Sequence, residues 1–502
     1  MDVQALELAT QAMNPNSEDA RFYRLTKQYL YGSWTDYPNA LVDLKTTWFR
    51  NHTGASKTAL DLANGKVNYN LKFIPETIRK AAERLEAYGV LERCVYGAPA
   101  KPFRTYNNHL VTQAKWAITG RCNYKCRHCF LSAPDARFGE LSTADCIRII
   151  HELAEAGVHV VTITGGEPLV RTDLLQLLDE FARCDIRILD IATNGALVND
   201  RLLDSLEERG MKPRFFMSFD GVGWHDWLRG IPGAEKQLME KFELLARRGY
   251  YTGSAMTLHR NNVGVLRESI NRLASVGVQT AIINRMLDFG EWRKFGRDLT
   301  LSQEEIFNAY LDYMPKFYAD GMPIWVTLNR MINLEKHSYR YTVQPILQPA
   351  DCTQTAVCSA AYRNCFINGD GKIAPCISIA GMEGQEKNFA DLSQMSVSDA
   401  LERSVYSACV GTKVSEYFAA NPKCESCRFK RWCRGGCRAQ ALEFDDSDFL
   451  GMDRHRCEFF YRHFTERILK HMAETVPQAE CANLPADFPL APEGEWGEPM
   501  PF

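Results

Sequence analysis

Apolar runs and helical patterns alternate along the chain between about residue 110 and residue 335. Six apolar runs have the length of strands, and stretches such as 173–184, with apolar residues at helical spacing, separate them. The runs cover residues 115–119, 158–164, 187–192, 214–219, 252–257 and 280–284. This alternation predicts a parallel sheet with helical crossovers. A right-handed series of six such units predicts an α/β fold, a partial (β/α)6 barrel of the TIM type, with ligands at the carboxyl ends of the strands.

The helix expected after the first strand carries signals for both of its ends. Ser142 and Asp145 predict its start through a capping box, and Gly157 predicts its end. Between them, apolar side chains such as Ile150 and Leu153 recur on one face. Residues 158–164 then predict the next strand.

Residues 1–108 carry a different pattern. Pro75 suits the first turn of a helix and Gly89 suits the position after its end, while apolar residues between them recur at helical spacing. Residues 90–96 then predict a short strand, so that helix, glycine turn and strand are similar to a wing. The prediction is an N-terminal α+β domain, with a winged helix as one interpretation and a helical extension packed on the barrel as the other. Residues 97–104, rich in proline and small residues, predict a linker.

The strand and helix rhythm stops after about residue 340, where a cysteine-rich stretch begins. Short strands are expected on both sides of the turn Asn368–Gly371. We expect a separate domain here that is organised by metal ions. Several prolines predict a tail that is irregular or disordered from about residue 473. The expected divisions are 1–108, 109–340, 341–465 and 466–502.

Composition narrows the class of protein. The 502 residues are 45% hydrophobic and 24% charged, as in ordinary globular proteins, and no apolar run of about 18 residues predicts a membrane span. The first residues, 1–7, lack the features of a signal peptide, so we expect a cytoplasmic protein. A net charge of -3 gives no global basic field for nucleic acid. Seventeen cysteines, mostly clustered, indicate metal ligands rather than disulfides.

Three cysteines follow the first predicted strand, at Cys122, Cys126 and Cys129, and an aromatic residue, Phe130, comes next. Iron-sulfur clusters are held mainly by Cys thiolates, so three ligands on four irons leave one iron free. A zinc site normally closes with a fourth ligand, which makes a zinc knuckle the weaker interpretation. The CxxxCxxC spacing with its aromatic residue resembles the signature of the radical S-adenosylmethionine (SAM) enzymes. The resemblance implies a 4Fe-4S cluster whose open iron binds SAM.

Polar residues at the ends of the next strands are expected to complete a SAM site. Gly165, Gly166 and Glu167 resemble the GGEP motif of the family, which binds the amino group of SAM; glycine permits close approach and a carboxylate accepts from an ammonium group. The ribose hydroxyls need polar partners, and the following strand ends offer them. The complete set of expected SAM contacts is Phe130, Gly165, Gly166, Glu167, Asn194, Ser218, Asp220 and Arg229. A turn, a helix cap or a surface ion pair is the alternative role for each.

The C-terminal cysteines are dense enough for zinc or for iron-sulfur clusters, because both accept four thiolates. Their order, with a central CxxCxxxxxCxxxC, resembles the SPASM domain of radical SAM peptide maturases. The resemblance implies two auxiliary 4Fe-4S clusters, the first on Cys352, Cys358, Cys376 and Cys437 and the second on Cys424, Cys427, Cys433 and Cys457. Cys365 competes with Cys352 for the first cluster. The remaining cysteines, Cys94, Cys146, Cys184, Cys409 and Cys481, are expected to be free.

The resemblance covers about residues 112–460 and implies an activity. Reductive cleavage of SAM gives methionine and a 5′-deoxyadenosyl radical, which abstracts hydrogen from a substrate carbon. We expect a maturase that installs a thioether or carbon-carbon crosslink in a ribosomally made precursor peptide. Its N-terminal pattern is similar to the peptide-recognition modules of such enzymes, so this region would hold the leader sequence. The family's usual electron donor is a small flavodoxin or ferredoxin.

Two other interpretations stay open. An anaerobic sulfatase-maturating enzyme, which forms formylglycine from Cys or Ser, would use the same parts, although such enzymes generally begin close to the first barrel strand. A non-enzymatic electron carrier or a structural zinc protein belongs to another class. No catalytic acid or base is predicted, because Arg285, Asp288 and Glu291 near the sixth strand are equally well explained by structural roles.

Overall fold

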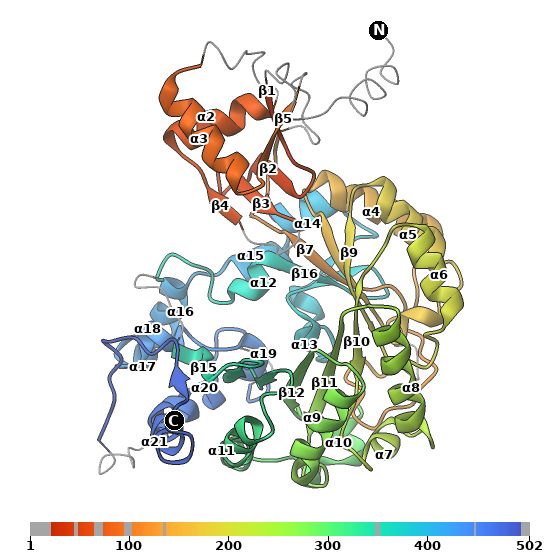
Figure 1. Ribbon diagram of the computed structural model, residues 1–502, viewed down its shortest axis with the longest axis vertical. Helices are drawn as coiled ribbons and strands as arrows, with labels where there is room; N and C mark the ends of the chain where they lie inside the picture. Colours follow the sequence, from red (N-terminus) through yellow and green to blue (C-terminus); the bar gives the residue numbers. More distant parts are fainter. Residues whose placement is uncertain are drawn as a thin grey trace.

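The structure is a computed structural model. It describes residues 22–44, 49–64, 74–94, 103–133, 137–346, 352–445 and 448–492. A small N-terminal unit lies at one end, and a large sheet with helices on its outer side forms the main body (Figure 1). Within the described ranges, no helix combines the length and apolar character that a membrane crossing requires. The expectations for residues 1–7, for most of the linker and for the prolines after residue 492 concern residues outside this description.

Six parallel strands in chain order form the centre of the main sheet. They are β7 (Gln113–Ala117), β8 (Val160–Thr164), β9 (Arg187–Thr193), β10 (Arg214–Ser218), β11 (Thr252–Leu258) and β12 (Thr280–Arg285). The crossover helices are α4 (Thr143–Glu155), α5 (Leu174–Arg183), α6 (Asp200–Glu208), α8 (Ala234–Arg247) and α9 (Leu266–Ser275). The predicted strands and the large parallel α/β sheet are therefore confirmed.

The sheet continues beyond β7 and β12. β16 (Asn364–Ile367), from the cysteine-rich stretch, pairs in parallel with β7, and β13 (Trp325–Leu328) pairs in parallel with β12. β16 also forms the expected hairpin with β17 (Lys372–Ala374). Pairing with β16 satisfies backbone groups that β7 would otherwise expose as an edge strand. The hairpin thus shares the sheet of the strand and helix units instead of forming a body of its own, while the domain boundaries stay a prediction.

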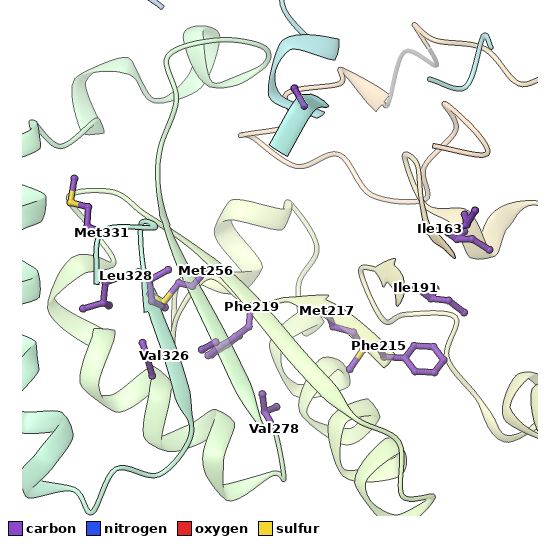
Figure 2. Packing of buried hydrophobic residues seen from close by; sticks show 14 of the residues in the cluster. Ile163, Ile191, Phe215, Met217, Phe219, Met256, Val278, Val326, Leu328 and Met331 are labelled. Atoms are coloured by element: carbon purple, nitrogen blue, oxygen red, sulfur yellow. The ribbon is translucent and has the colours of Figure 1, made fainter. Parts of the chain in front are cut away.

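The crossover helices and the sheet share one apolar core. Leu177 and Phe181 of α5 are buried in it, as are Ile163, Ile191 and Phe215 of the strands. Figure 2 shows part of this core, including Ile163, Ile191 and Phe215 of the neighbouring strands β8, β9 and β10. Fully burying a side chain of this size contributes about 1.5–3 kcal/mol. The core therefore holds the strand ends, and the loops that follow them, in fixed positions.

Local signals set the ends of α4 as predicted. The Ser142 hydroxyl accepts a hydrogen bond from the Asp145 N–H at 3.1 Å. Gly157 follows the helix with φ of +89°, a conformation that favours glycine. A Cβ at this position would also lie 2.9 Å from the Tyr106 ring. The N-cap hydrogen bond and the glycine end are therefore confirmed, whereas the Asp145 carboxylate accepts from the Ser142 hydroxyl at 2.6 Å and does not complete the capping box.

The N-terminal unit is an α+β arrangement. The expected helix is α3 (Glu76–Ala87), and the expected strand is β5 (Leu91–Cys94), which pairs antiparallel with β1 (Phe22–Leu25). A second sheet has the order β4 (Phe49–Asn51), β3 (Ala40–Asp43), β2 (Tyr29–Ser33) and β6 (Arg104–Thr105). Helix α2 (Gly54–Ala63) packs with α3 in the unit's own apolar core. A winged-helix assignment stays a prediction.

The C-terminal stretch consists mainly of short helices. Those that bear on the site are α12 (Ser359–Arg363), α15 (Val405–Gly411), α18 (Lys430–Cys433) and α20 (Arg454–Tyr461).

The tail, predicted to be irregular from about residue 473, is irregular over most of its described part, although it is packed on the main body. Helix α21 (Phe464–Thr475) stacks Phe464 on Phe307 of α11 (Gln303–Ala319) at 3.6 Å between ring centroids. Further on, β19 (Glu480–Cys481) pairs with β15 (Arg340–Val343), and Phe488 is buried. Apolar burial orders this segment despite its prolines.

Candidate active site

The cysteine loop leaves the carboxyl end of β7 and is docked on α7 (His225–Arg229). The Arg127 N–H donates to the Leu228 carbonyl oxygen at 2.9 Å, and the Arg127 guanidinium lies 4.9 Å from the centre of the Trp227 ring. Gly230 ends α7 with φ of +70°, and a Cβ there would lie 3.0 Å from the Lys125 carbonyl oxygen. The loop that carries the three cysteines therefore rests on the turn after β10.

The three thiols of the loop are partly exposed and free of disulfides. Burial raises the pKa of Cys122 to about 12, and the nearby Cys126 and Cys129 contribute in the same direction. The Tyr124 and Ala133 N–H groups point at the sulfurs of Cys122 and Cys129, at 3.4 and 3.3 Å. Such donors favour thiolates, which a bound metal would require after displacing the thiol protons. This donor set fits a thiolate-held cluster.

A buried ion pair lies next to Cys126. The Arg229 Nε atom bonds the Asp220 Oδ2 atom at 2.7 Å, and the Arg229 Nη1 atom lies 3.6 Å from the Cys126 sulfur. Burial alone would raise the pKa of Asp220, but the Arg229 guanidinium holds it well below its usual range. A guanidinium beside a thiol favours the thiolate. The pair therefore fits an anionic cluster at this loop.

Asp220 is the buried partner of Arg229, and its predicted ribose contact stays a prediction. Its side chain is 0% exposed, and its second oxygen accepts from the Thr257 N–H at 3.4 Å. His225 Nδ1 accepts from the Asp220 N–H at 3.2 Å and lies 3.5 Å from the Asp220 Oδ2 atom. Asp220 thus positions Arg229 under the loop. Ser218, partly exposed at the end of β10, remains placed for a hydroxyl ligand.

Glu167 ties two strand ends together. Its buried carboxylate accepts from the Thr193 hydroxyl and the Asn194 N–H, both at 2.7 Å, and from the Leu169 N–H at 3.1 Å. Burial raises its pKa, and these donors oppose the rise. A Cβ at Gly165 would lie 2.6 Å from the Thr119 carbonyl oxygen, so this glycine permits contact with the cysteine loop's own backbone. Binding of the SAM amino group by this motif stays a prediction.

Asn194 and Phe130 adjoin the loop from two sides. The Asn194 Nδ2 atom donates to Asn123 Oδ1 at 2.7 Å, next to Cys122. Phe130 is closely packed by Gly290 and Gly381, because a Cβ at these glycines would lie 2.7 Å from its Cα and 2.5 Å from its carbonyl oxygen. Both predicted residues therefore lie beside the proposed cluster.

A cavity of about 500 Å³ joins the loop to the C-terminal stretch. Its wall includes Phe130 from the loop and Cys358, Cys433 and Cys437 from the stretch beyond. Four arginines also line it, Arg285, Arg330, Arg434 and Arg456, and no carboxylate is among its described lining residues. Sequence reasoning missed the last three arginines, because no local pattern shows that Arg330 meets Arg434 and Arg456 of the cysteine-rich stretch.

The three charged residues near β12 divide between the cavity and the surrounding structure. Arg285 lines the cavity and pairs with Glu443 behind it. Glu291 instead accepts from the Ser132 hydroxyl at 2.9 Å, and Asp288 pairs with Arg297 at 3.3 Å. Glu291 and Asp288 therefore have structural partners.

The four cysteines predicted for the second auxiliary cluster are close enough for their charges to shift the pKa of a neighbouring thiol. They are Cys424, Cys427, Cys433 and Cys457. Burial raises the pKa of Cys433 to about 12, and the thiols of Cys424 and Cys427 add to the rise. The Tyr417 hydroxyl lies 3.2 Å from the Cys424 sulfur, and the Tyr461 hydroxyl lies 3.5 Å from the Cys427 sulfur. These four cysteines fit the predicted cluster, and the two tyrosine hydroxyls contact the sulfurs of its ligands.

The turn between Cys433 and Cys437 connects the two predicted cluster sites. Arg434, Gly435 and Gly436 all have positive φ, at +51°, +83° and +73°. Successive backbone N–H groups in such turns can form anion-binding concavities, as at many iron-sulfur sites. The Cys437 N–H donates to Asp453 Oδ2 at 2.7 Å, and Asp453 caps α20, which carries Cys457.

For the first auxiliary cluster, Cys358, Cys376 and Cys437 form a second electrostatic group. Burial raises the pKa of Cys376 to about 12, and Cys437 and Cys358 add to it. Cys365 is fully buried within β16 in the core of the main sheet, where burial raises its pKa to about 12. The Cys352 sulfur lies 3.9 Å from the Arg431 carbonyl oxygen. Its place as the fourth ligand stays a prediction.

Cys409 lies near this group, although the sequence predicted a free thiol without a role. Its helix, α15, is tied to the loop before Cys358 by the Val357 N–H, which donates to the Thr412 carbonyl oxygen at 2.8 Å. Burial raises the pKa of Cys409 to about 12, and Cys358 and Cys376 add to the rise. No spacing motif includes this residue, so the sequence carried no signal for it.

The hydroxyl of Tyr406 bears on whether the site of Cys358, Cys376 and Cys437 fits a cluster. Tyr406 is 0% exposed, and its hydroxyl has no hydrogen-bond partner among the described residues. It lies on α15, and burial together with the thiols of Cys365, Cys409, Cys358 and Cys376, in that order, raises its pKa. Leaving a buried hydroxyl unpaired costs about 1–3 kcal/mol. A cluster sulfur at this place would accept its hydrogen bond, so the residues present fit an iron-sulfur group.

Comparison with known proteins identifies the class. Residues 116–273 match the radical SAM superfamily, and residues 358–428 match SPASM, an iron-sulfur cluster-binding domain. The chain therefore carries a radical SAM domain and a SPASM domain, which support SAM and iron-sulfur clusters as cofactors.

The names of the similar proteins refer to different activities. An AdoMet-dependent heme synthase from Oleidesulfovibrio alaskensis is 25% identical over 66% of this chain and 84% of its own. The antilisterial bacteriocin subtilosin biosynthesis protein AlbA from Bacillus subtilis is 24% identical over 66% of this chain and 67% of its own. The structure of Streptococcus suis SuiB bound to precursor peptide SuiA shares the fold, with a TM-score of 0.57, 14% identity and coverage of 84% of this chain and 97% of that one.

Proposed function

We propose that the protein is a peptide maturase, which modifies a ribosomally synthesised precursor and most simply installs a thioether or carbon-carbon crosslink. The cavity bounded by both the SAM-cluster loop and the C-terminal cysteines carries this proposal, because a substrate there would lie between the radical source and the auxiliary cysteines. SAM and its cluster supply a 5′-deoxyadenosyl radical when bound. The lining residues would hold the peptide and exclude water. Sulfatase maturation remains the alternative, and its formylglycine product distinguishes it.

A second cavity supports a peptide substrate. It has a volume of about 400 Å³ and lies between the N-terminal unit, with Asp36 and Tyr37, and the C-terminal stretch, with Lys413. It shares Ser359 and Arg434 with the wall of the first cavity. An extended segment could therefore run from the N-terminal unit to the cysteine loop. A small, compact substrate would not need such a path.

The edge strand β4 offers a place for a leader sequence. It is the outermost strand of its sheet, and added strands bind at such edges through main-chain hydrogen bonds. The His52 N–H donates to the Asn39 carbonyl oxygen at 3.1 Å. Donors alternate along an antiparallel strand, so the Asn51 N–H points outward. It is available to an incoming backbone carbonyl.

Removal of residues 1–108 should raise the KM for the precursor at least about tenfold, equivalent to about 1.4 kcal/mol of binding. The cluster loop and the cavity begin after this segment, so uncoupled 5′-deoxyadenosine release should persist.

The substrate would be the product of a short, cysteine-containing open reading frame beside the gene, and mass spectrometry would identify its modification.

A milder variant separates leader binding from folding. Asn51→Pro removes the outward N–H and should weaken precursor binding in the same direction, while Asn51→Ala retains the donor and should not. Unchanged precursor affinity in both the deletion and Asn51→Pro would contradict the leader-binding role.

The proposal includes three 4Fe-4S clusters, one at the loop and two at the C-terminal cysteines. A flavodoxin or ferredoxin remains the expected electron donor. The auxiliary clusters would accept the substrate's electron or bind its thiolate.

Tyr406→Phe should make the potential of the cluster near Cys358 and Cys376 more negative by about 20–60 mV. The hydroxyl would stabilise the more negatively charged reduced state, and phenylalanine cannot donate. Redox titration followed by electron paramagnetic resonance measures this shift. Tyr310→Phe is a matched control, because Tyr310 also has a fully buried hydroxyl without a partner among the described residues, yet its charged neighbour is Arg285. Equal potentials in all three proteins would argue against the hydrogen bond.

A tetrapyrrole substrate is the second candidate. The name of the heme synthase relative and the four arginines of the cavity favour it, because porphyrin carboxylates suit guanidinium partners. Parallel assays with the encoded peptide and with a porphyrin carrying propionates would decide between the two. Modification of the porphyrin alone would replace the peptide proposal.

A further inference from the structure

Three metal-ligating side chains meet in the outer helical layer. His151 lies on α4, while Glu180 and Cys184 lie one turn apart, within α5 and at its C-terminal cap. The ligand atoms of the three lie within 4.8 Å of one another, and His151 Nε2 is 2.6 Å from Glu180 Oε1. Figure 1 shows α4 and α5 next to each other on the outside of the sheet. None of the three residues lines the cavity beside the cysteine loop.

The donor set and its exposure suit one kind of ion. Nitrogen, oxygen and sulfur ligands together are typical of zinc, which accepts three protein ligands and a water. The His151 side chain is 53% exposed, so an ion can enter from solvent, whereas the Glu180 side chain is 7% exposed and held in place. We propose that His151, Glu180 and Cys184 bind a Zn²⁺ ion, with a water as the fourth ligand.

Two neighbouring groups respond to the ion. Arg183 pairs with Glu180, but its side chain is 66% exposed and can turn into solvent when zinc takes over the carboxylate. Cys184 is a free cysteine, so zinc must displace its thiol proton. Binding converts Cys–SH and Zn²⁺ into Cys–S–Zn⁺ and a proton, and its affinity should increase with pH. The bound ion would link α4 to α5.

The test uses the holoenzyme with its iron-sulfur clusters in place. After incubation with zinc and gel filtration, elemental analysis should find about one more zinc per chain in the wild type than in Cys184→Ser or His151→Ala. Cys481→Ser removes a partly buried cysteine elsewhere and should retain the zinc. Iron content and 5′-deoxyadenosine release should be the same in all four proteins. X-ray absorption at the zinc edge should show one sulfur among the wild-type ligands.

Equal zinc content in the wild type and both ligand variants would overturn the site. Loss of zinc in only one of the two variants would overturn the three-ligand arrangement. Circular dichroism and thermal unfolding show whether each variant is folded, and Cys184→Asp serves as a second variant with a ligating side chain, which should retain zinc but lose the sulfur signal.

Discussion

Replacing Cys126 with alanine should lower 5′-deoxyadenosine release more than about 1000-fold, the scale of removing an essential catalytic group. Cys126 is the middle thiol of the loop and the one that faces Arg229, at 3.6 Å. Two remaining thiols cannot hold a cluster that keeps one iron open for SAM. The measurement is an anaerobic assay with dithionite and SAM, followed by chromatography and mass spectrometry, together with iron and sulfide analysis.

The matched control is Cys146→Ala. Cys146 is a buried cysteine in α4, close to the sheet, and no cysteine is among the groups that shift its pKa. The control should keep its iron and its 5′-deoxyadenosine release. Cys126→Ala protein that still cleaves SAM at a wild-type rate would exclude this loop as the SAM-cluster site.

Changing Asp220 to asparagine should lower the free energy of unfolding by about 3–5 kcal/mol, because it leaves the Arg229 charge buried without its partner. The two side chains are 0% and 10% exposed, so water cannot compensate. Arg229 would also lose the contact that holds it near the Cys126 sulfur, and SAM cleavage should fall with stability. Chemical denaturation of the anaerobically purified protein measures the first effect.

The pH dependence of stability gives a second measurement on the same variant. Arg229 depresses the pKa of Asp220 in the folded protein. The ion pair therefore stabilises the fold above the unfolded-state pKa of Asp220, about 3.9. This stabilisation is lost as the pH falls through the pKa of Asp220 in the folded protein. Wild-type stability should therefore decline below about pH 5, and Asp220→Asn should lack this part of the decline.

The control for the ion pair is Asp312→Asn. Asp312 pairs with Lys316 at 2.5 Å, and the side chains are 70% and 40% exposed. Exposed pairs contribute about 0–1 kcal/mol, so this change should hardly alter the free energy of unfolding. A loss as small for Asp220→Asn would contradict the buried role of the pair.

The sequence by itself determined the framework. Strands β7 to β12 and the ends of α4 follow from apolar periodicity, capping and glycine, which act over a few residues and are visible locally. The cysteine loop and the C-terminal thiols were also visible, because metal chemistry demands particular residue types at short spacing.

The tertiary structure decided where those parts meet. It joined β16 to β7, paired Asp220 with Arg229, and brought Cys409 beside Cys358 and Cys376. It also packed the irregular tail on the main body through β19 and the buried Phe488.

The arginine-lined cavity arises in the same way, from residues more than a hundred positions apart. A side chain's partner depends on burial and on the competing charges around it, and these depend on contacts between distant segments. Local pattern therefore determined the strands and the cluster motifs of this protein, whereas the charge of its cavity and the role of Asp220 were decided when the segments packed together.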